Sequence, residues 1–517
     1  MADTTEPTPG VWALTLPDLA ATERLAAALA DEIRTGDLVT LSGGLGSGKT
    51  TFARFLIRRL LGQPDLEVPS PTFTLMQVYE SEAPPIVHAD LYRIGNPREL
   101  IELGWEEYAE RGAVTLVEWP ERGEGVLDRA RLDVALELSP GDGPDARLAV
   151  LSGTGDFAPR LDRLRALTTL LDRSGWTGAE RMPVQGDAST RAYERLVRDT
   201  GETAILMISP RRPDGPPVRR GKPYSAIARL AESVHAFAAV DRGLRALGFS
   251  APKIYGEDLE SGLLILEDLG SEGVTDEAGP IPERYAEAAR LLAKLHATTL
   301  PNVLPIAEGE DHVVPSYDLD AMLIEAELLA DWYVPHILGA LMSGSARAEF
   351  VNAWTETLQE VLEGPQTWVL RDYHSPNLIW LPEREGVKRV GLLDFQDAVL
   401  GPPGYDVVSL LQDARIDVPA DLELKLLGHY VRERKGAETD FDMAAFARAY
   451  AIMGAQRATK ILGIFARLDK RDGKPQYLRH LPRIEAYLAR NLAHPALAKL
   501  RGWYGAYLPG AAGLGAE

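Results

Sequence analysis

The stretch Gly43–Thr50 (GGLGSGKT) decides how the first part of the chain is interpreted, because it has the full spacing of a phosphate-binding loop. The apolar run Asp37–Leu41 before it predicts a buried strand, and residues 50–61 after it carry an apolar stripe at helical spacing. In such a strand–loop–helix unit, backbone N–H groups and the helix N-terminus converge on phosphate oxygens. We therefore predict a nucleotide-binding α/β domain at this end of the chain.

Each part of this loop has an expected chemical role. Glycines leave backbone N–H groups open to phosphate, Lys49 places a charge at the β- and γ-phosphates of ATP, and the Thr50 hydroxyl can ligate Mg²⁺. The residues predicted to contact the nucleotide are Gly43, Gly46, Gly48, Lys49, Thr50 and Thr51.

Two carboxylates follow short apolar runs that predict strands. Asp90 ends the run from residue 86, and Glu118 ends the run from residue 114. In a parallel sheet both side chains emerge at the carboxyl edge, where the glycine loop also lies. A single strand-end carboxylate is better explained as a helix cap or a solvated group. Two at corresponding positions predict ligands for Mg²⁺ or groups that orient water for hydrolysis, so Asp90 and Glu118 are candidates for both the metal and the catalytic role.

Three strings in this region resemble the signature segments of the TsaE family: Ser70–Leu75 (SPTFTL), His88–Arg93 (HADLYR) and Val117–Pro120 (VEWP). These proteins are ATPases of the bacterial machinery that makes threonylcarbamoyladenosine in tRNA, and the resemblance spans roughly residues 10–150. It implies that Lys49 and Thr50 bind phosphate and Mg²⁺.

The same resemblance implies further roles. Asp90 and Glu118 would serve the metal and hydrolysis, residues 70–72 would form a switch-like segment, and Trp119 would lie beside the site, although a core position explains this tryptophan equally well. The implied partners are TsaD- and TsaB-like proteins, with ATP hydrolysis resetting their complex. A nucleotide-dependent switch module is the alternative for this half.

A second constellation lies far along the chain, in Asp372–Asn377 (DYHSPN) and in Asp394, which follows the apolar run 390–393. Phosphoryl transfer to a hydroxyl needs a proton acceptor near that hydroxyl and metal ligands on the phosphates. The spacing predicts Asp372 as the catalytic base, with Asn377 and Asp394 as Mg²⁺ ligands. Because a phosphate-binding loop enzyme does not need such a catalytic loop, the chain is predicted to join two enzymes.

Residues 160–500 resemble the aminoglycoside phosphotransferase superfamily in the segments Leu393–Ala398 (LDFQDA) and Gly401–Asp406 (GPPGYD). By that resemblance Asp406 would brace the catalytic loop, although a helix-cap role fits the bare residue equally. Within the superfamily, Gln185–Tyr193 (QGDASTRAY) followed by Leu206-Met207 resembles AmgK, the kinases that phosphorylate the anomeric hydroxyl of N-acetylmuramate and N-acetylglucosamine in cell-wall recycling.

This second resemblance implies further binding residues. Gly186 and Ser189 would belong to the loop over the phosphates, and Glu267 would lie on the strand that meets adenine, unless that segment is an ordinary connection between lobes. Four residues could line a sugar pocket, although helix packing explains them better: Tyr317, Asp318, Glu325 and Trp332.

Two departures from the superfamily pattern leave alternatives open. The segment Ala204–Ile208 lacks the usual strand lysine, while Lys222 lies in a nearby basic loop, and Arg371 precedes Asp372 in place of a His-Gly-type residue. A pseudokinase, or a kinase acting on an aminoglycoside, choline or another small alcohol, are the alternatives to an amino-sugar kinase.

Length and composition agree with two globular α/β enzymes. The 517 residues are 45% hydrophobic and 25% charged, and the net charge of −21 argues against non-specific binding of a polyanion. No cysteine is present, which excludes disulfides and thiol catalysis. No signal peptide or membrane-length apolar run is evident, so a cytoplasmic protein is expected.

The predicted fold class is α/β, with a phosphate-binding-loop NTPase domain built on a mainly parallel sheet and then a bilobal, protein-kinase-like α+β domain. The predicted domains are residues 1–155 and 156–517, with a seam at Gly153–Asp156. In the second, a small sheet-rich lobe (about 160–270) precedes a helical lobe (about 271–505).

Overall fold

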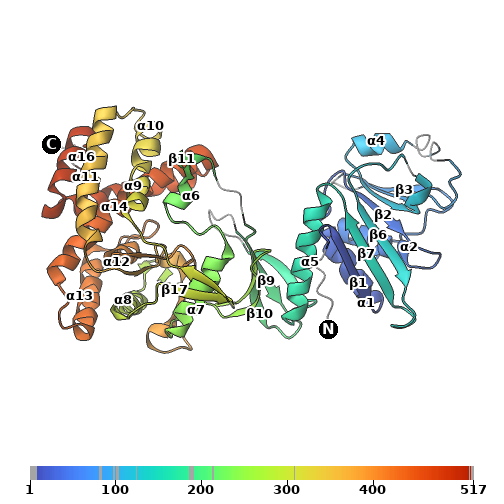
Figure 1. The fold of residues 1–517 in the computed structure, drawn as a ribbon, viewed down its shortest axis with the longest axis horizontal. Coiled ribbons are helices and arrows are strands. Elements are labelled where there is room, and N and C mark those ends of the chain that lie inside the picture. The colour runs from blue at the N-terminus through green and yellow to red at the C-terminus, as the bar shows by residue number, and fades with distance from the viewer. Residues whose placement is uncertain are drawn as a thin grey trace. The chain divides into compact units, whose positions relative to one another are not determined.

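The computed structural model describes residues 8–80, 84–96, 99, 104–123, 125–184, 191–211, 215–307, 309–511 and 513. The chain divides into two compact units, Met1–Glu180 and Arg181–Glu517 (Figure 1). Each unit is described by itself below. No helix in the described ranges is long and apolar enough to cross a membrane.

The first unit is built on one seven-stranded mixed sheet. Strand β2 pairs in parallel with β5 and β6, and β5 pairs in parallel with β4, while the remaining pairs are antiparallel. In sheet order the strands are β1 (Val11–Leu16), β7 (Arg147–Gly153), β6 (Leu132–Leu138), β2 (Leu38–Ser42), β5 (Val114–Glu118), β4 (Ile86–Asp90) and β3 (Met76–Tyr79). The parallel strands at the centre of the sheet confirm the predicted fold class. Parallel strands are usually buried on both faces, which explains why their sequences are continuous apolar runs.

Helices cover this sheet and share its core. Phe52 and Leu56 of α2 are fully buried in one cluster with Val39 and Leu41 of β2. The helical elements are α1 (Leu19–Ala30), α2 (Lys49–Leu61), α4 (Trp105–Glu110), the 3₁₀ turn η1 (Pro120–Gly123) and α5 (Phe157–Arg173).

Helix α5 follows the seam predicted near residue 155 but packs with the first unit. Its buried Phe157, Leu161 and Leu164 belong to the core cluster of the seven-stranded sheet. Arg160 is also buried and pairs with Asp37 at 2.8 Å. The structure divides at Glu180/Arg181, because these buried residues of the helix belong to the core of the first unit.

The second unit begins with a sheet-rich lobe, as the sequence predicts. The β13–β14, β14–β10 and β10–β9 pairs are antiparallel. In sheet order the strands are β13 (Ile254–Asp258), β14 (Leu263–Glu267), β10 (Thr203–Ile208), β9 (Ala192–Val197) and β8 (Glu180–Val184). The ribbon of β11 (Pro217–Arg219) and β12 (Lys222–Pro223) and the helices α6 (Tyr224–Ile227) and α7 (Val234–Ala246) complete this lobe.

Helices dominate the rest of this unit, and one continuous hydrophobic core includes residues of both lobes. The α-helices are α8 (Pro282–Ala297), α9 (Leu319–Ala326), α10 (Val334–His336), α11 (Gly344–Leu362), α12 (Gly404–Leu411), α13 (Ala420–Ala437), α14 (Met443–Asp472), α15 (Leu481–Leu492) and α16 (Ala498–Tyr507). Short ribbons are inserted among them: β15 (Thr275–Asp276) with β16 (Gly279–Pro280), β17 (Val303–Ala307) with β18 (Glu310–Val313), β19 (Thr367–Val369) with β22 (Val399–Gly401), and β20 (Leu378–Trp380) with β21 (Val390–Leu392). A π-helical turn (Leu329–Tyr333) and the 3₁₀ turns 375–377, 386–389, 475–480 and 495–497 complete the fold.

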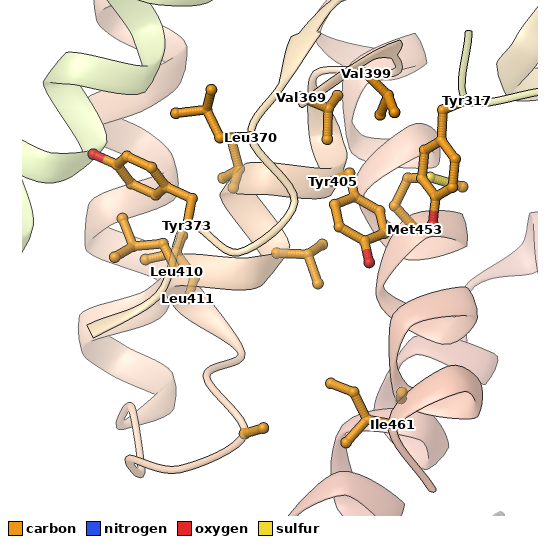
Figure 2. Packing of buried hydrophobic residues seen from close by; sticks show 14 of the residues in the cluster. Tyr317, Val369, Leu370, Tyr373, Val399, Tyr405, Leu410, Leu411, Met453 and Ile461 are labelled. Atoms are coloured by element: carbon orange, nitrogen blue, oxygen red, sulfur yellow. The ribbon is translucent and has the colours of Figure 1, made fainter. Parts of the chain in front are cut away.

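The segment after β19 is anchored in this core on both sides of Asp372. Leu370 and Tyr373 are buried, and Figure 2 shows both side chains in the same hydrophobic cluster as Leu410 and Leu411 of α12. The Tyr373 hydroxyl also donates a hydrogen bond to the Ala288 carbonyl of α8 at 2.9 Å. Apolar burial on either side therefore fixes the backbone that carries Asp372.

We expect Gly463→Ala in α14 to destabilise the second unit. A Cβ at Gly463 would lie 2.3 Å from the carbonyl carbon of Leu328, and a backbone atom cannot yield without shifting its helix. Overpacking of this kind costs about 1–3 kcal/mol. Urea unfolding followed by tryptophan fluorescence should show the lower midpoint.

Gly436→Ala in α13 is the matched control, because a Cβ there meets no atom within 4 Å. Alanine is favoured over glycine inside a helix by roughly 0.5–1 kcal/mol, so this variant should unfold at or above the wild-type midpoint. A Gly463→Ala protein as stable as Gly436→Ala would contradict the predicted clash.

Candidate active sites

The sheet register of the first unit brings its two predicted carboxylates together. Asp90 of β4 lies directly opposite Glu118 of β5, and Leu41, the residue before the end of β2, pairs with Glu118 from the other side. Both carboxylates are buried. They therefore lie at the carboxyl edge of the parallel strands, where the glycine loop leaves β2.

Close approach and backbone conformation explain the loop glycines. At Gly43, with φ +132°, a Cβ would lie 2.1 Å from the Leu136 carbonyl oxygen of β6. Gly46 and Gly48 have φ values of +75° and +106°, in the region that favours glycine. A Cβ at Gly46 would meet nothing within 4 Å, so the backbone here is open on that side. Such an open loop at the start of α2 suits an incoming phosphate.

Lys49 is buried and points back along the loop. Its Nζ donates to the carbonyl oxygens of Gly43 and Gly44 at 2.8 and 2.9 Å, and lies 3.9 Å from the ring centroid of Trp119. Burial lowers the pKa of this ammonium below its usual value, although the nearby Glu118 opposes the shift. Trp119 is thus beside the loop, as the family resemblance implies.

Glu118 is held through both carboxylate oxygens. The Thr50 hydroxyl donates to Oε2 at 3.0 Å, and the Nε2 of His88 lies 3.0 Å from Oε1. His88 is fully buried and was not predicted as a site residue. Strand alternation could have identified it, because His88 lies two residues before Asp90 and therefore on the same face of β4.

Asp90 connects the sheet edge to the segment at residues 70–72. Its Oδ2 accepts hydrogen bonds from Ser70 Oγ at 2.9 Å and Thr72 Oγ1 at 2.5 Å, and its Oδ1 accepts from the Tyr92 backbone N–H at 3.0 Å. The neighbouring Phe73 side chain is 82% exposed. A change in the contacts of Asp90 would therefore also affect residues 70–72 and the exposed ring of Phe73.

The residues present fit a magnesium nucleotide. The loop offers open glycine backbone, a lysine, and a hydroxyl paired with a carboxylate, which are the groups that hold phosphate and Mg²⁺. The buried Ser47 Oγ has no hydrogen-bond partner within the described ranges. Thr51, the remaining predicted contact, is the third residue of α2.

In the second unit a short hairpin brings the two predicted metal ligands together. Strand β20 begins directly after Asn377 and β21 ends at Leu392, with Leu378 opposite Leu392. The Leu393 N–H donates a hydrogen bond to the Asn377 carbonyl oxygen at 2.9 Å. Asp394 directly follows Leu393, so this bond brings Asp394 close to Asn377. The Asn377 side chain in turn donates to the Asp372 carbonyl oxygen at 2.9 Å. The three predicted residues therefore form one cluster.

Asp406 of α12 braces the catalytic segment. Its Oδ2 accepts from the Leu370 N–H at 2.6 Å and its Oδ1 from the Arg371 N–H at 2.9 Å. The side chain is fully buried, and burial raises its pKa to about 7. The alternative helix-cap role is not observed, since both oxygens are turned to residues 370 and 371.

Arg371 has a left-handed backbone, with φ +66°, and its guanidinium is buried behind the catalytic segment. It donates to the Ala228 carbonyl at 2.8 Å and to Glu325. Glu325 also accepts from the Tyr317 hydroxyl and lies 2.9 Å from Lys460 Nζ. Tyr317 and Glu325 are thus core residues that position this loop rather than sugar-pocket residues.

Asp372 remains accessible at the surface of this cluster, with 40% of its side chain exposed. Desolvation by the surrounding protein raises the pKa of Asp372, but His374, Lys460 and Arg457 outweigh that effect and hold the pKa below its usual value. The nearest of these contacts is His374 Nε2, 3.9 Å from Oδ1. An ionised carboxylate on a fixed backbone can orient a hydroxyl and accept its proton.

Asp394 is paired with a cation that the sequence analysis did not single out. Its Oδ1 accepts from Arg191 NH1 at 2.8 Å and from Gln396 Nε2 at 2.9 Å, and its φ is +57°. Asp397 turns away and accepts from the Ala231 N–H at 2.6 Å. The arginine lies in the quoted segment Gln185–Tyr193, which is the signal that could have drawn attention to it.

The other predicted residues of this unit have different surroundings. The Glu267 carboxylate accepts from Arg384 at 2.6 Å and from the Lys253 N–H at 3.1 Å, so it ties β14 to the β20–β21 connection. Gly186 and Ser189 lie outside the described residues. Together, Asp372, Asn377 and Asp394 fit a magnesium nucleotide, since Mg²⁺ is typically held by one or two protein ligands plus substrate phosphates.

Comparison with known proteins assigns each unit to a family. The model for the threonylcarbamoyl adenosine biosynthesis protein TsaE matches residues 16–143, and that for the phosphotransferase enzyme family matches residues 180–447. An N-acetylmuramate/N-acetylglucosamine kinase of Caulobacter vibrioides is 39% identical over 67% of this chain and 97% of its own. A tRNA threonylcarbamoyladenosine biosynthesis protein TsaE of Rickettsia felis is 41% identical over 23% of this chain and 67% of its own.

Among solved structures, the ADP-bound aminoglycoside phosphotransferase APH(2'')-Ib matches 63% of this chain and 96% of its own, with 13% identity and a TM-score of 0.38. The sheet register, the two clusters and the family matches lead to one conclusion. The chain is a fusion that belongs to the TsaE family through its first unit and to the phosphotransferase enzyme family through its second.

Proposed function

We propose that the second unit is an ATP-dependent kinase that phosphorylates the anomeric hydroxyl of N-acetylmuramate or N-acetylglucosamine in cell-wall recycling. The observation that carries the proposal is the cluster of Asp372, Asn377 and Asp394, joined by the bonds Leu393 N–H to Asn377 O and Asn377 Nδ2 to Asp372 O. The 39% identity over 97% of a kinase for these sugars supports the acceptor.

Each residue of the cluster has a role in this reaction. Asn377 and Asp394 would hold Mg²⁺, which would neutralise charge on the phosphates. Asp372 orients the sugar hydroxyl and takes its proton as the oxygen bonds to the γ-phosphorus and ADP leaves. Asp406 fixes the backbone of the catalytic segment through two N–H groups, so the carboxylate of Asp372 does not need to reorganise.

For the first unit we propose ATP hydrolysis in support of threonylcarbamoyladenosine modification of tRNA, with TsaD- and TsaB-like proteins as partners. Lys49 and Thr50 would bind phosphate and Mg²⁺, and Glu118 and Asp90 would act on the metal and the attacking water. The bonds from Ser70 and Thr72 to Asp90 support a segment that responds to the nucleotide. Since both proposed activities depend on ATP, we place the protein in the cytoplasm.

Asp372→Asn is expected to lower sugar phosphorylation by roughly 10²–10⁴-fold, because the hydroxyl loses its proton acceptor while the fold is preserved. The measurement is product formation from ATP, Mg²⁺ and a panel of N-acetylmuramate, N-acetylglucosamine, an aminoglycoside and choline. Lys49→Ala is the control and should leave this activity unchanged. Phosphorylation of the aminoglycoside or choline alone would replace the proposed acceptor, and no product from any acceptor would contradict the kinase assignment.

Glu118→Gln is expected to reduce ATP hydrolysis by the first unit about 100-fold or more, because both the Thr50 hydroxyl and His88 meet this carboxylate. Phosphate release should be followed without sugar, in the Asp372→Asn protein, with purified TsaD- and TsaB-like proteins added. Arg59→Ala, which removes an exposed ion pair with Asp31 at the end of α2, is the control. Hydrolysis that stays absent with both partners present would contradict the proposed ATPase role.

A further inference from the structure

The small lobe of the second unit lacks a lysine where a kinase needs a cation on its nucleotide. Strand β10, Thr203–Ile208 (TAILMI), contains no charged residue. In kinases a strand lysine reaches the nucleotide phosphates and complements the metal-binding aspartate. Another cation must therefore meet the phosphates if this unit uses ATP.

The arginines of the β11–β12 ribbon pair with carboxylates outside the metal-binding cluster. Arg219 forms an ion pair with Glu327 at 2.5 Å, and Arg220 lies 3.7 Å from Asp320, both at the α9 region of the helical lobe. Lys222 lies on the same ribbon, opposite Arg219. These contacts hold the ribbon against acidic residues of the helical lobe and not against Asp394.

Among the described residues of the small lobe, Arg191 is a cation that reaches the metal-binding cluster. It directly precedes β9, whose first residue Ala192 pairs with Ile208 at the end of β10. Its NH1 lies 2.8 Å from Asp394 Oδ1, and only 18% of its side chain is exposed. The arginine thus approaches Asp394 from the strand adjacent to the one that lacks the lysine.

Arg191 also lines a cavity of about 220 Å³ in this unit. Met207 of β10, Phe237 of α7 and Gln396 beside Asp394 line the same cavity, so it is bordered by residues of both lobes. A guanidinium presents planar paired donors, which suit phosphate oxygens better than a single ammonium does.

We propose that Arg191 binds the α- and β-phosphates of ATP in the second unit and takes the place of the absent strand lysine. The proposal rests on the kinase function proposed above. The NH1 of Arg191 and the Oδ1 of Asp394 are 2.8 Å apart. Phosphate binding by Arg191 and metal binding by Asp394 would therefore occur next to each other. Arg195, four residues further along the same segment, pairs instead with Asp268 at 2.8 Å and serves as the matched control.

The test measures nucleotide binding. Titration calorimetry with ADP and with adenosine would use the full chain carrying Lys49→Ala and Thr50→Ala, which removes phosphate and metal contacts from the first unit. Arg191→Ala should weaken ADP about 10–100-fold and leave adenosine unchanged, because a hydrogen bond to a charged group contributes about 1.5–3 kcal/mol. Arg191→Lys should recover part of the loss, and Arg195→Ala should bind ADP like its parent.

A direct phosphate contact predicts that the loss persists in EDTA. If the difference between Arg191→Ala and its parent disappears without Mg²⁺, Arg191 acts only through Asp394 and the proposal is overturned. Equal loss of ADP and adenosine, or unchanged ADP binding, would also overturn it. A wild-type chain that phosphorylates no sugar would remove the proposed function, whereas an Arg191-dependent loss of ADP affinity would still support this inference.

Discussion

One buried carboxylate, Asp406, sets the geometry on which the second unit's chemistry depends. Its two oxygens bind the N–H groups of Leu370 and Arg371 at 2.6 and 2.9 Å, so the backbone just before Asp372 is fixed by two hydrogen bonds. Such bonds are strong because they form where no water competes. The positive φ of Arg371 is sustained by this clamp and by the burial of its guanidinium beside Glu325.

The first unit achieves the same precision with a sheet. Register places Asp90 opposite Glu118, and the parallel pairing of β2 with β5 brings the glycine loop to the same edge. Hydrogen bonding then orients each carboxylate, through Thr50 and His88 for one and through Ser70 and Thr72 for the other. In both units backbone hydrogen bonds fix the position of a carboxylate, and polar side-chain contacts fix its orientation.

The features that depend on local sequence patterns could be predicted from the sequence. Apolar runs ending in Asp90, Glu118 and Asp394 identify strand ends, and the fold class follows from them. What it does not show are contacts between residues distant in the chain. The ion pair of Arg191 with Asp394 spans 203 positions, and the burial of α5 against the first unit depends on which core accepts its apolar stripe. His88 was visible through strand alternation, but its pairing with Glu118 depends on the register between β4 and β5.

Both sites place a basic side chain against the acidic groups that would hold a metal. Lys49 is bound to loop carbonyls near Glu118 and Asp90, and Arg191 is bound to Asp394. These contacts balance charge within each site. A magnesium nucleotide supplies both an anion and a cation, so it can satisfy the lysine or arginine and the carboxylates together. The phosphates and the metal are then complementary to two groups that already lie side by side, which reduces the reorganisation needed on binding.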